Sequence, residues 1–410
     1  MRNLILMHLE SLNYTNYRIN SHMFPNLSKI ENKSLSFSHY FSTATSTLMV
    51  LADLMYGGML QYEVCDGLDA VPEKYCYKDS LFDSMKNEGY ITKVLYYPIG
   101  GDCISAEKRH VAGFQCELTS LMKYEEYMLE IEQIMNKQQP FALMLCNTIS
   151  NIALNYHVSS ISADSGLDRW KYGYIFMDDC VGTVMKLLEA NNLLDNTSII
   201  FYGDHGDEYY AHGNHQGLTH AIEPYASLIH TPFWIYDKRW GKLENINDLL
   251  CTTDIRMIVQ KMMEMPESEF VWEDLKIPKR SYTIARNAYA CQPMRAESFN
   301  KGYSLTDGRF LLLVNGSGLA FYDTEMDVDC QNNLLKFFIY NQGILYLNKD
   351  LNSSLKYHYK FLINIGSVRQ IRQLFYYYKK RLYEEVLRLF RYAGCEKKIE
   401  ELEFEKIQNI

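Results

Sequence analysis

An aspartate and a histidine follow directly after an apolar run near the middle of the chain. The run at residues 199–202 leads through a glycine into Asp204 and His205. A buried strand that ends in this way delivers two metal-binding side chains to the edge of a sheet, which is where α/β proteins place their chemistry. The first apolar run, residues 4–9, likewise ends in a carboxylate, Glu10. Two strands with such endings indicate a divalent-metal enzyme rather than a binding module.

The two central ligands are neighbours in the sequence, which sets a condition on the backbone. In a continuing strand, Asp204 and His205 would point to opposite faces of the sheet. Both reach one metal ion only if the strand stops at this point. Gly203 and Gly206 flank the pair and permit such a stop.

A run of small hydroxyl residues lies between the two strands. Residues 42–47 read Ser-Thr-Ala-Thr-Ser-Thr and open an apolar stretch, predicted to be a helix, that Gly57 and Gly58 end. Hydroxyl residues are favoured N-caps, and capping alone would account for them. A hydroxyl at a helix N-terminus also lies in a positive field that stabilises an alkoxide and binds an anionic ester. A metal on that oxygen would make it a nucleophile for phosphoryl or sulfuryl transfer.

Three histidines follow the Asp-His pair closely: His212, His215 and His220. A single surface histidine in a glycine-rich loop usually has no function, but a cluster directly after two metal-binding residues favours at least one working residue. We expect these histidines to bind ester oxygens or to protonate the leaving group, with His215 also in substrate binding.

Other polar residues in the same region carry weaker signals. Asn147 ends an apolar run and is expected to face the same pocket and bind substrate. His8 shares the strand parity of Glu10, so it either supports the site from behind or is an ordinary core histidine. The remaining histidines that we interpret as structural are His157, His230 and His358.

The elements that must position these residues alternate along the first 265 residues. Short apolar strands and amphipathic helices predict a mostly parallel central sheet sandwiched by helices, an α/β fold. We expect helices at 81–88, closed by Gly89, and at 168–190, and strands at 91–97 and 141–146. The long helix is expected to bury one stripe: Tyr172, Ile175, Phe176, Val181, Val184 and Leu188.

The pattern changes after about residue 270. Four short apolar runs joined by Asp307-Gly308 and Asn315-Gly316 predict a small antiparallel subdomain. We therefore divide the chain into a catalytic α/β domain (1–270), an antiparallel subdomain (271–345) and a helical tail (346–410).

The tail is basic and aromatic up to about residue 398. Such a helix can lie on a membrane surface or bind an acidic partner. Because its apolar positions recur at helical spacing, we favour packing on the core or, through 354–398, on a second subunit in a homo-oligomer.

Composition narrows the setting. The net charge of −9 argues against nucleic acid as a partner. Ten scattered cysteines without CxxC pairs indicate reduced thiols rather than a disulfide framework. No stretch approaches the roughly 20 apolar residues of a membrane span, and no signal peptide is visible. The sequence as written predicts a cytoplasmic protein; a chain cut from a longer one would fit a secreted or extracytoplasmic location.

Taken together, these pieces resemble the sulfatase-like branch of the alkaline phosphatase superfamily over most of residues 1–335. The pieces, in order, are the strand with Glu10, the Thr-Ser-Thr helix start, Gly89-Tyr90, Tyr174 to Asp179, Leu193 to Thr197, Gly203 to Glu208, His212-Gly213, Leu305 to Phe310 and Phe321 to Asp323. The last two resemble the C-terminal hairpin of soluble sulfatases. His212 falls where sulfatase-like proteins have the histidine of a Gly-Glu-His-Gly motif.

Departures from the sulfatase pattern bear on the chemistry. Sulfatases carry a Cys or Ser in a Cys-x-Pro-x-Arg context that is oxidised to formylglycine, and no Cys, Pro or Arg occurs between Thr43 and Gly57. A lone glutamate with a threonine nucleophile resembles the phosphoethanolamine transferases and lipoteichoic acid synthases. That resemblance selects Thr45 as the nucleophile, with Thr43 and Thr47 as alternatives.

By the same resemblance, Glu10, Thr45, Asp204 and His205 would hold one divalent ion. Two carboxylates, an imidazole and an oxyanion suit Mn²⁺ or Zn²⁺ better than Mg²⁺ or Ca²⁺. The resemblance implies a phosphodiesterase or phosphotransferase acting on a small-molecule, glycan or lipid-head-group ester. The alternatives are a sulfatase without formylglycine and an inactive sulfatase-like binding protein.

Overall fold

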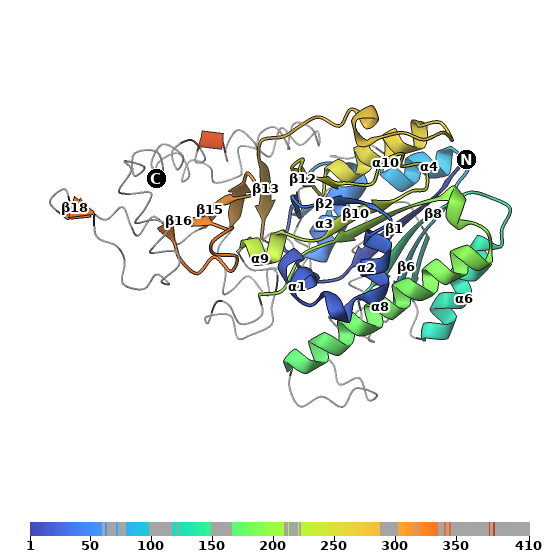
Figure 1. Cartoon of the computed structure of the whole chain (residues 1–410), viewed down its shortest axis with the longest axis horizontal. Helices are drawn as coiled ribbons and strands as arrows, with labels where there is room; N and C mark the ends of the chain where they lie inside the picture. The colour runs from blue at the N-terminus through green and yellow to red at the C-terminus, as the bar shows by residue number, and fades with distance from the viewer. Residues whose placement is uncertain are drawn as a thin grey trace.

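The computed structural model of the chain describes residues 1–59, 62–63, 71–72, 79–97, 117–120, 123–148, 166–208, 212, 220, 223–287, 302–315, 318–334, 340–341, 344–345, 377 and 380–381. A large α/β unit and a smaller antiparallel sheet account for most of these residues (Figure 1). The antiparallel sheet lies at one side of the large unit, beside the short helix α9 (Ala226–Ile229).

The central sheet has eight strands in the order β11-β2-β10-β9-β1-β8-β6-β7. The strands β1, β6, β7, β8 and β9 run parallel, whereas β10 is antiparallel to β9 and β2. The strand bounds are β1 (Asn3–Leu9), β2 (Leu35–Phe37), β6 (Ile91–Tyr97), β7 (Glu117–Ser120), β8 (Phe141–Asn147), β9 (Thr197–Gly203), β10 (Phe233–Tyr236) and β11 (Asn245–Ile246). The predicted mostly parallel sheet is confirmed.

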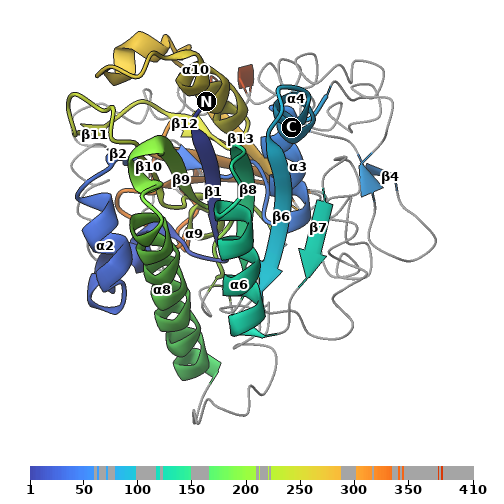
Figure 2. The same cartoon turned by 90° about the vertical axis from the view of Figure 1, so that its right-hand side faces the viewer.

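Helices cover both faces of this sheet, as Figure 2 shows. One face packs against α3 (Thr47–Tyr56), α4 (Leu81–Asn87) and α10 (Asp254–Glu264); the other packs against α2 (Pro25–Glu31), α6 (Tyr124–Met135) and α8 (Gly166–Ala190). The short helices are α1 (Tyr14–Ile19), η1 (Ser21–Met23), η4 (Leu194–Asn196) and η5 (Trp272–Leu275). This is the three-layer arrangement that alternating strands and helices predict.

Strand parity decides which face each side chain joins. Even-numbered apolar residues of β1, β6, β8 and β9 pack in one cluster with α3, α4 and α10. Odd-numbered apolar residues of the same strands pack in a second cluster with α2, α6 and α8. The sheet therefore separates two cores, and a polar residue at an even position near a strand end is directed to the α3 side.

The second sheet consists of β13 (Thr283–Arg286), β14 (Tyr303–Thr306), β15 (Phe310–Asn315) and β16 (Gly318–Asp323), all antiparallel. The Asp307-Gly308 turn joins β14 to β15, with Gly308 at φ +100°. The predicted antiparallel sheet is confirmed. Isolated strand pairs are β3 (Tyr40–Phe41) with β12 (Leu250–Cys251), β4 (Tyr62–Glu63) with β5 (Val71–Pro72), and β17 (Tyr340–Asn341) with β18 (Ile344–Leu345).

The predicted helix and turn at 81–89 are found where expected. Ser80 and Asp83 cap α4 reciprocally, each side chain accepting from the other's backbone N–H at 3.1 and 2.9 Å. Gly89 follows the helix at φ +94°, the left-handed conformation of a helix C-terminal glycine.

The predicted stripe of the long helix is partly wrong. Val181, Val184 and Leu188 are buried, but Tyr172, Ile175 and Phe176 are 45%, 39% and 42% exposed. The buried residues of the first half are Tyr174, Met177 and Cys180, which are turned toward the sheet.

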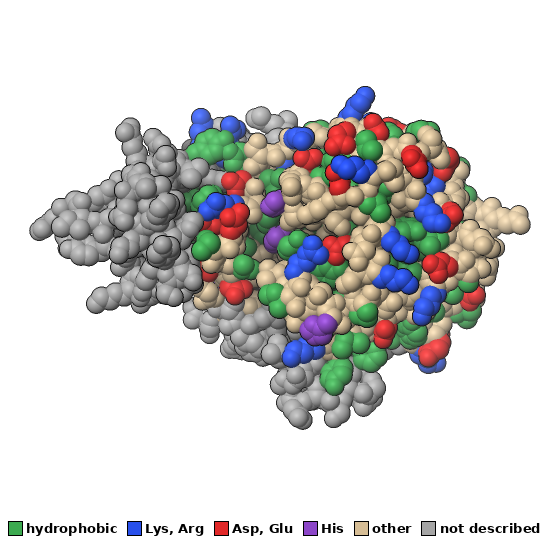
Figure 3. Space-filling view, viewed as in Figure 1, with side chains coloured by type: hydrophobic (Ala, Val, Ile, Leu, Met, Phe, Trp, Pro, Cys, Tyr) green, Lys and Arg blue, Asp and Glu red, His purple; other side chains and the backbone are tan. Residues whose placement is uncertain are grey.

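Among the described helices, none is both long and apolar enough to cross a membrane. Acidic and basic side chains are interspersed over the described part of the face in Figure 3, in keeping with the modest net charge. Apart from the short helical pieces at 377 and 380–381, the predicted tail lies outside the described residues.

Candidate active site

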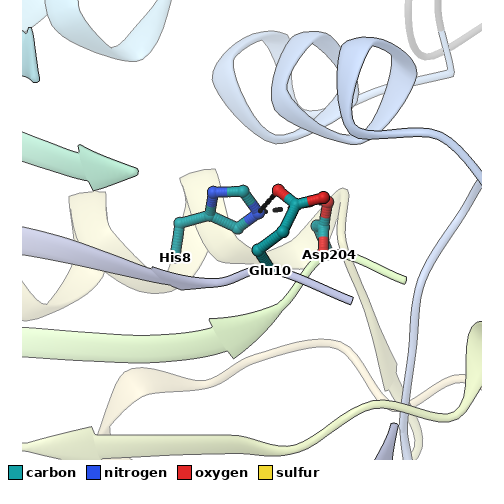
Figure 4. Close-up of side chains that lie close together, drawn as sticks. All are labelled: His8, Glu10 and Asp204. Atoms are coloured by element: carbon teal, nitrogen blue, oxygen red, sulfur yellow. Dashed lines mark ion pairs between the residues drawn. The ribbon is translucent and has the colours of Figure 1, made fainter. Parts of the chain in front are cut away.

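Three buried side chains converge where β1 and β9 end on the α3 side of the sheet. Glu10 follows β1 directly and Asp204 follows β9 directly, and Leu9 is paired with Gly203 in the register. Both carboxylates are at most 1% exposed. His8 lies two residues before Glu10, on the same side of the strand, and points at the same two carboxylates (Figure 4). Parallel strands with equal register thus bring the two predicted carboxylates together.

The first turn of α3 supplies the hydroxyl. Helix α3 begins at Thr47, with Ser46 as its N-cap. The Thr47 Oγ1 lies 2.8 Å from Asp204 Oδ2 and 3.4 Å from Glu10 Oε1. It also lies 3.1 Å from the Nε2 atom of His205. The hydroxyl that meets the predicted ligands is therefore that of Thr47, at the positive end of the helix.

These groups fit a divalent ion. The His205 Nε2 lies 3.2 Å from Asp204 Oδ2 and 3.9 Å from Glu10 Oε1. Ligands of one tetrahedral ion with bonds near 2.1 Å are separated by roughly 3.4 Å, which is close to these distances. The Thr47 hydroxyl has one proton, yet two carboxylate oxygens and an imidazole nitrogen surround it. A buried cluster with more acceptors than protons matches the charge and donor set of a bound cation.

Both ring nitrogens of His205 are in the protonation state that a metal ligand requires. The Nδ1 lies 3.0 Å from the Gly206 carbonyl oxygen, an acceptor, so Nδ1 carries the proton and donates it. The Nε2 lone pair then faces Asp204. Burial, the dominant influence, lowers the pKa of His205 to about 4, so the ring is neutral near pH 7.

Asp204 and His8 shift each other's pKa. Burial acts to raise the pKa of Asp204, but the adjacent His205 and His8 outweigh it and lower that pKa. Burial acts to lower the pKa of His8, yet the Asp204 carboxylate outweighs burial and raises it. Asp204 is therefore ionised at neutral pH, as a metal ligand must be.

A strained turn after Glu10 aims a backbone donor at Asp204. Ser11 has φ +58°, an uncommon conformation for a residue other than glycine, and its N–H donates to Asp204 Oδ1 at 3.0 Å. The Tyr174 hydroxyl of α8 donates to the Ser11 carbonyl oxygen. The turn is thus fixed from both sides and holds the Asp204 carboxylate in place.

Gly203 and Gly206 allow the strand to stop. A Cβ at Gly206 would lie 2.1 Å from the Ser227 carbonyl oxygen, and one at Gly203 would lie 2.7 Å from the Leu12 carbonyl oxygen. Only glycine fits this close backbone approach. Because β9 ends at Gly203, Asp204 and His205 both turn toward Thr47, as the flanking glycines predict.

Two of the three predicted late histidines lie beside the cluster. The His220 ring stacks on His205 with centroids 4.3 Å apart, and its Nδ1 lies 3.0 Å from Asp207 Oδ1. The His212 ring stacks on Tyr225 at 3.8 Å, and its Nδ1 lies 3.1 Å from Glu208 Oε2. Each is thus oriented by a carboxylate, and His220 is the one in contact with a candidate ligand.

Among the described residues, Thr45 and Asn147 make other contacts. Thr45 is buried, and its backbone N–H donates to the Arg286 carbonyl oxygen at 3.2 Å. Asn147 is at an odd position of β8, on the α8 side of the sheet, within reach of the Cys180 thiol. The structure therefore does not bring Asn147 to the carboxylates. His215 lies outside the described residues.

The structure adds two groups that sequence reasoning did not assign to the site, His8 as a neighbour of both carboxylates and the Ser11 backbone N–H. The parity of His8 with Glu10 was the available signal for the first. Nothing in the sequence marks the left-handed Ser11, since serine gives no preference for that conformation.

Comparisons with known proteins agree with this fold. A family model described as Sulfatase matches residues 172–245, which include most of α8, β9, Asp204, His205 and β10. No curated protein matches the chain.

Several solved structures are similar in fold. A protein in the alkaline phosphatase superfamily from Vibrio parahaemolyticus is 15% identical, with 81% of each chain covered and a TM-score of 0.56. The lipoteichoic acid synthase LtaP from Listeria monocytogenes is 15% identical, with 80% of this chain and 88% of that chain covered and a TM-score of 0.55. A 2-O GAG sulfatase is 13% identical, with 96% of each chain covered and a TM-score of 0.62.

The fold is the alkaline phosphatase/sulfatase-like fold, and the segment that carries Asp204 and His205 matches the Sulfatase family model. The resemblance to the sulfatase-like branch of the alkaline phosphatase superfamily is therefore confirmed.

Proposed function

We propose that the protein is a metal-dependent phosphoryl-transfer enzyme, a phosphodiesterase or phosphotransferase, with Thr47 as its nucleophile. The observation that carries this proposal is the position of the Thr47 hydroxyl at the start of α3, within 3.4 Å of Glu10, Asp204 and His205. The substrate class that we propose is a phosphate ester of a small molecule, glycan or lipid head group.

Glu10, Asp204 and His205 would hold one Mn²⁺ or Zn²⁺, with the Thr47 oxygen as a further donor. Two carboxylates and an imidazole are a donor set that these ions accept readily. When bound, such an ion supplies positive charge that favours the ionised Thr47 oxygen and neutralises charge on the ester oxygens.

The side chains suggest a path for the reacting groups. The Thr47 hydroxyl directs its proton at Asp204 Oδ2, and its oxygen forms a bond to phosphorus as the bond from phosphorus to the leaving oxygen breaks. His220, aligned by Asp207, gives a proton to that leaving oxygen. Water or an acceptor hydroxyl then gives its proton to His220 and bonds to phosphorus as the bond from phosphorus to Thr47 breaks, and the Thr47 oxygen takes back the proton from Asp204.

The nucleophile favours phosphate over sulfate esters. The helix start has no cysteine, and its serines lack the following Pro and Arg of the motif that is converted to formylglycine in sulfatases. The fold itself does not separate the two, since similar structures include a lipoteichoic acid synthase and a 2-O GAG sulfatase. The match of residues 172–245 to the Sulfatase model keeps sulfate-ester hydrolysis as the second candidate.

Two matched variants test the proposal. Thr47→Ala should lower turnover of an aryl phosphodiester at least about 10³-fold, the loss typical of removing a nucleophile, while Thr45→Ala keeps most activity. Mass spectrometry of enzyme stopped during turnover should place the adduct on Thr47. An active Thr47→Ala with an inactive Thr45→Ala would move the nucleophile to Thr45. Faster turnover of the aryl sulfate than of the phosphodiester by wild type would instead favour the sulfatase function.

A further inference from the structure

His8 is a fully buried histidine at an unusual place. It lies near the C-terminal end of β1, a central strand of the large sheet, two residues before Glu10. Its Nε2 lies 3.0 Å from Asp204 Oδ2 and 3.4 Å from Glu10 Oε2, as Figure 4 shows. One imidazole nitrogen thus meets both of the carboxylates that we assign to the cation.

The ring is not held like an ordinary core histidine. A buried polar atom in a folded protein normally has a hydrogen-bond partner. Neither nitrogen of His8 makes a hydrogen bond of good geometry with any group in the described part of the chain. By contrast, the partly buried His230 donates from Nε2 to the Ser38 carbonyl oxygen at 2.9 Å.

The sheet gives His8 no room to turn elsewhere. Its neighbours in the register are Cys146 on β8 and Tyr202 on β9, and the Tyr202 ring stacks on it at 5.7 Å. A side chain in the middle of a packed sheet keeps one direction. Nε2 is therefore fixed toward Asp204 and Glu10.

The separations match those of ligands on one ion. The contacts of His8 Nε2 with the two carboxylates, 3.0 and 3.4 Å, are close to the roughly 3.4 Å between ligands of a tetrahedral ion. His205 Nε2 lies at the comparable distance of 3.2 Å from Asp204 on another side.

We propose that His8 is a direct ligand of the divalent ion, so that two imidazoles and two carboxylates, from His8, His205, Glu10 and Asp204, hold it. This inference rests on the cation site of the proposed function but not on the reaction. A second imidazole shifts the site toward zinc-like ions and away from Mg²⁺ and Ca²⁺, which prefer oxygen.

The test counts coordinated imidazoles and measures affinity with the metal alone. In Mn²⁺-loaded wild type, pulsed EPR should detect nitrogen couplings from two directly bound imidazoles. His8→Gln should show one and should bind Mn²⁺ and Zn²⁺ at least about 100-fold more weakly, a loss no smaller than removal of an outer partner causes. His230→Gln, which removes a histidine bonded to the Ser38 carbonyl oxygen and to none of the four ligands, should change neither quantity.

Three results would overturn the inference. A single coordinated imidazole in wild type would do so without any variant, even if His8→Gln bound metal weakly, because His8 would then only position the carboxylates. Unchanged affinity in a folded His8→Gln would also do so. Wild type that binds no ion would remove the proposed function as well, whereas the first two results leave it intact.

Discussion

At the scale of single residues, the cluster is defined by a shortage of protons. Thr47 has one hydroxyl proton and three acceptor groups around it, and His205 already donates its own proton to Gly206. Such an arrangement is costly when buried unless a cation compensates it. A divalent ion bound by these side chains would supply that compensation.

His220 is the residue that we expect to protonate the leaving group. His220→Gln should slow hydrolysis of an alkyl phosphodiester by about 10²–10⁴-fold, the usual contribution of a general acid. The loss should be much smaller for a p-nitrophenyl ester, whose leaving group needs no proton. His212→Gln, which removes the histidine paired with Glu208, serves as the control. Equal losses for both esters would rule out a proton donor at His220.

Sequence reasoning identified Glu10, Asp204 and His205 because each follows directly after an apolar strand. The resemblance to the threonine-nucleophile transferases selected Thr45 and left Thr43 and Thr47 as alternatives, whereas the hydroxyl that contacts the carboxylates is that of Thr47. The start at Thr47 depends on how α3 packs against the sheet, which is a tertiary effect.

At the scale of elements, a buried ion pair joins α3, and the hydroxyl-rich segment at residues 42–47 that leads into it, to the antiparallel sheet. Arg286 of β13 contacts Asp53 of α3 at 2.8 Å, and the Thr43 hydroxyl donates to the same carboxylate at 2.7 Å. The backbones of Thr43 and Arg286 are also hydrogen-bonded. The position of the loop before Thr47 thus depends on a strand more than 200 residues later in the chain.

Breaking this pair should be severe. Arg286→Met leaves the Asp53 carboxylate buried without its guanidinium and should lower the free energy of unfolding by about 3–5 kcal/mol. The double variant Asp53→Asn/Arg286→Met should recover part of that loss. Lys261→Met, in the exposed Lys261–Glu264 pair, should change it by less than about 1 kcal/mol. Urea unfolding measures all three, and equal effects of Arg286→Met and Lys261→Met would contradict the role of the buried pair.

The helix α8 shows where periodicity stops being informative. Its second half buries the predicted Val181, Val184 and Leu188, but its first half turns Tyr172 and Phe176 outward. Both groups of residues have helical spacing. Which one faces the sheet depends on the path of the helix across it, which local sequence does not encode.

At the scale of the whole molecule, one sheet separates two apolar cores, and the buried carboxylates Glu10 and Asp204 follow two of its central strands, β1 and β9. The alternation of strands and helices was sufficient to predict this architecture and the antiparallel addition. The pairing of Arg286 with Asp53 was not predictable, because it joins elements far apart in the sequence.

A histidine whose ring bonds to a backbone carbonyl oxygen, His230, predicts how stability depends on pH. Burial lowers the pKa of His230 to about 4, below its ordinary value of 6.5. The unfolded chain therefore binds this proton more readily, and its contribution to stability falls as the pH drops from about 6.5 to 4, by about 3 kcal/mol in total. When the free energy of unfolding is measured against pH, that of His230→Gln should fall less steeply in acid than that of wild type. An equal loss of stability in acid for both proteins would contradict a neutral His230 in the folded state.

The central claim is that Glu10, Thr47, Asp204 and His205 form a metal site, and elemental analysis of the purified protein tests it most directly. We predict about one Mn²⁺ or Zn²⁺ per chain in wild type, loss of the ion in Asp204→Asn, and retention in Asp237→Asn, a buried carboxylate paired with Arg239 instead. Wild-type protein without bound ion after dialysis against Mn²⁺ and Zn²⁺ would contradict the account and favour a sulfatase-like binding protein without activity.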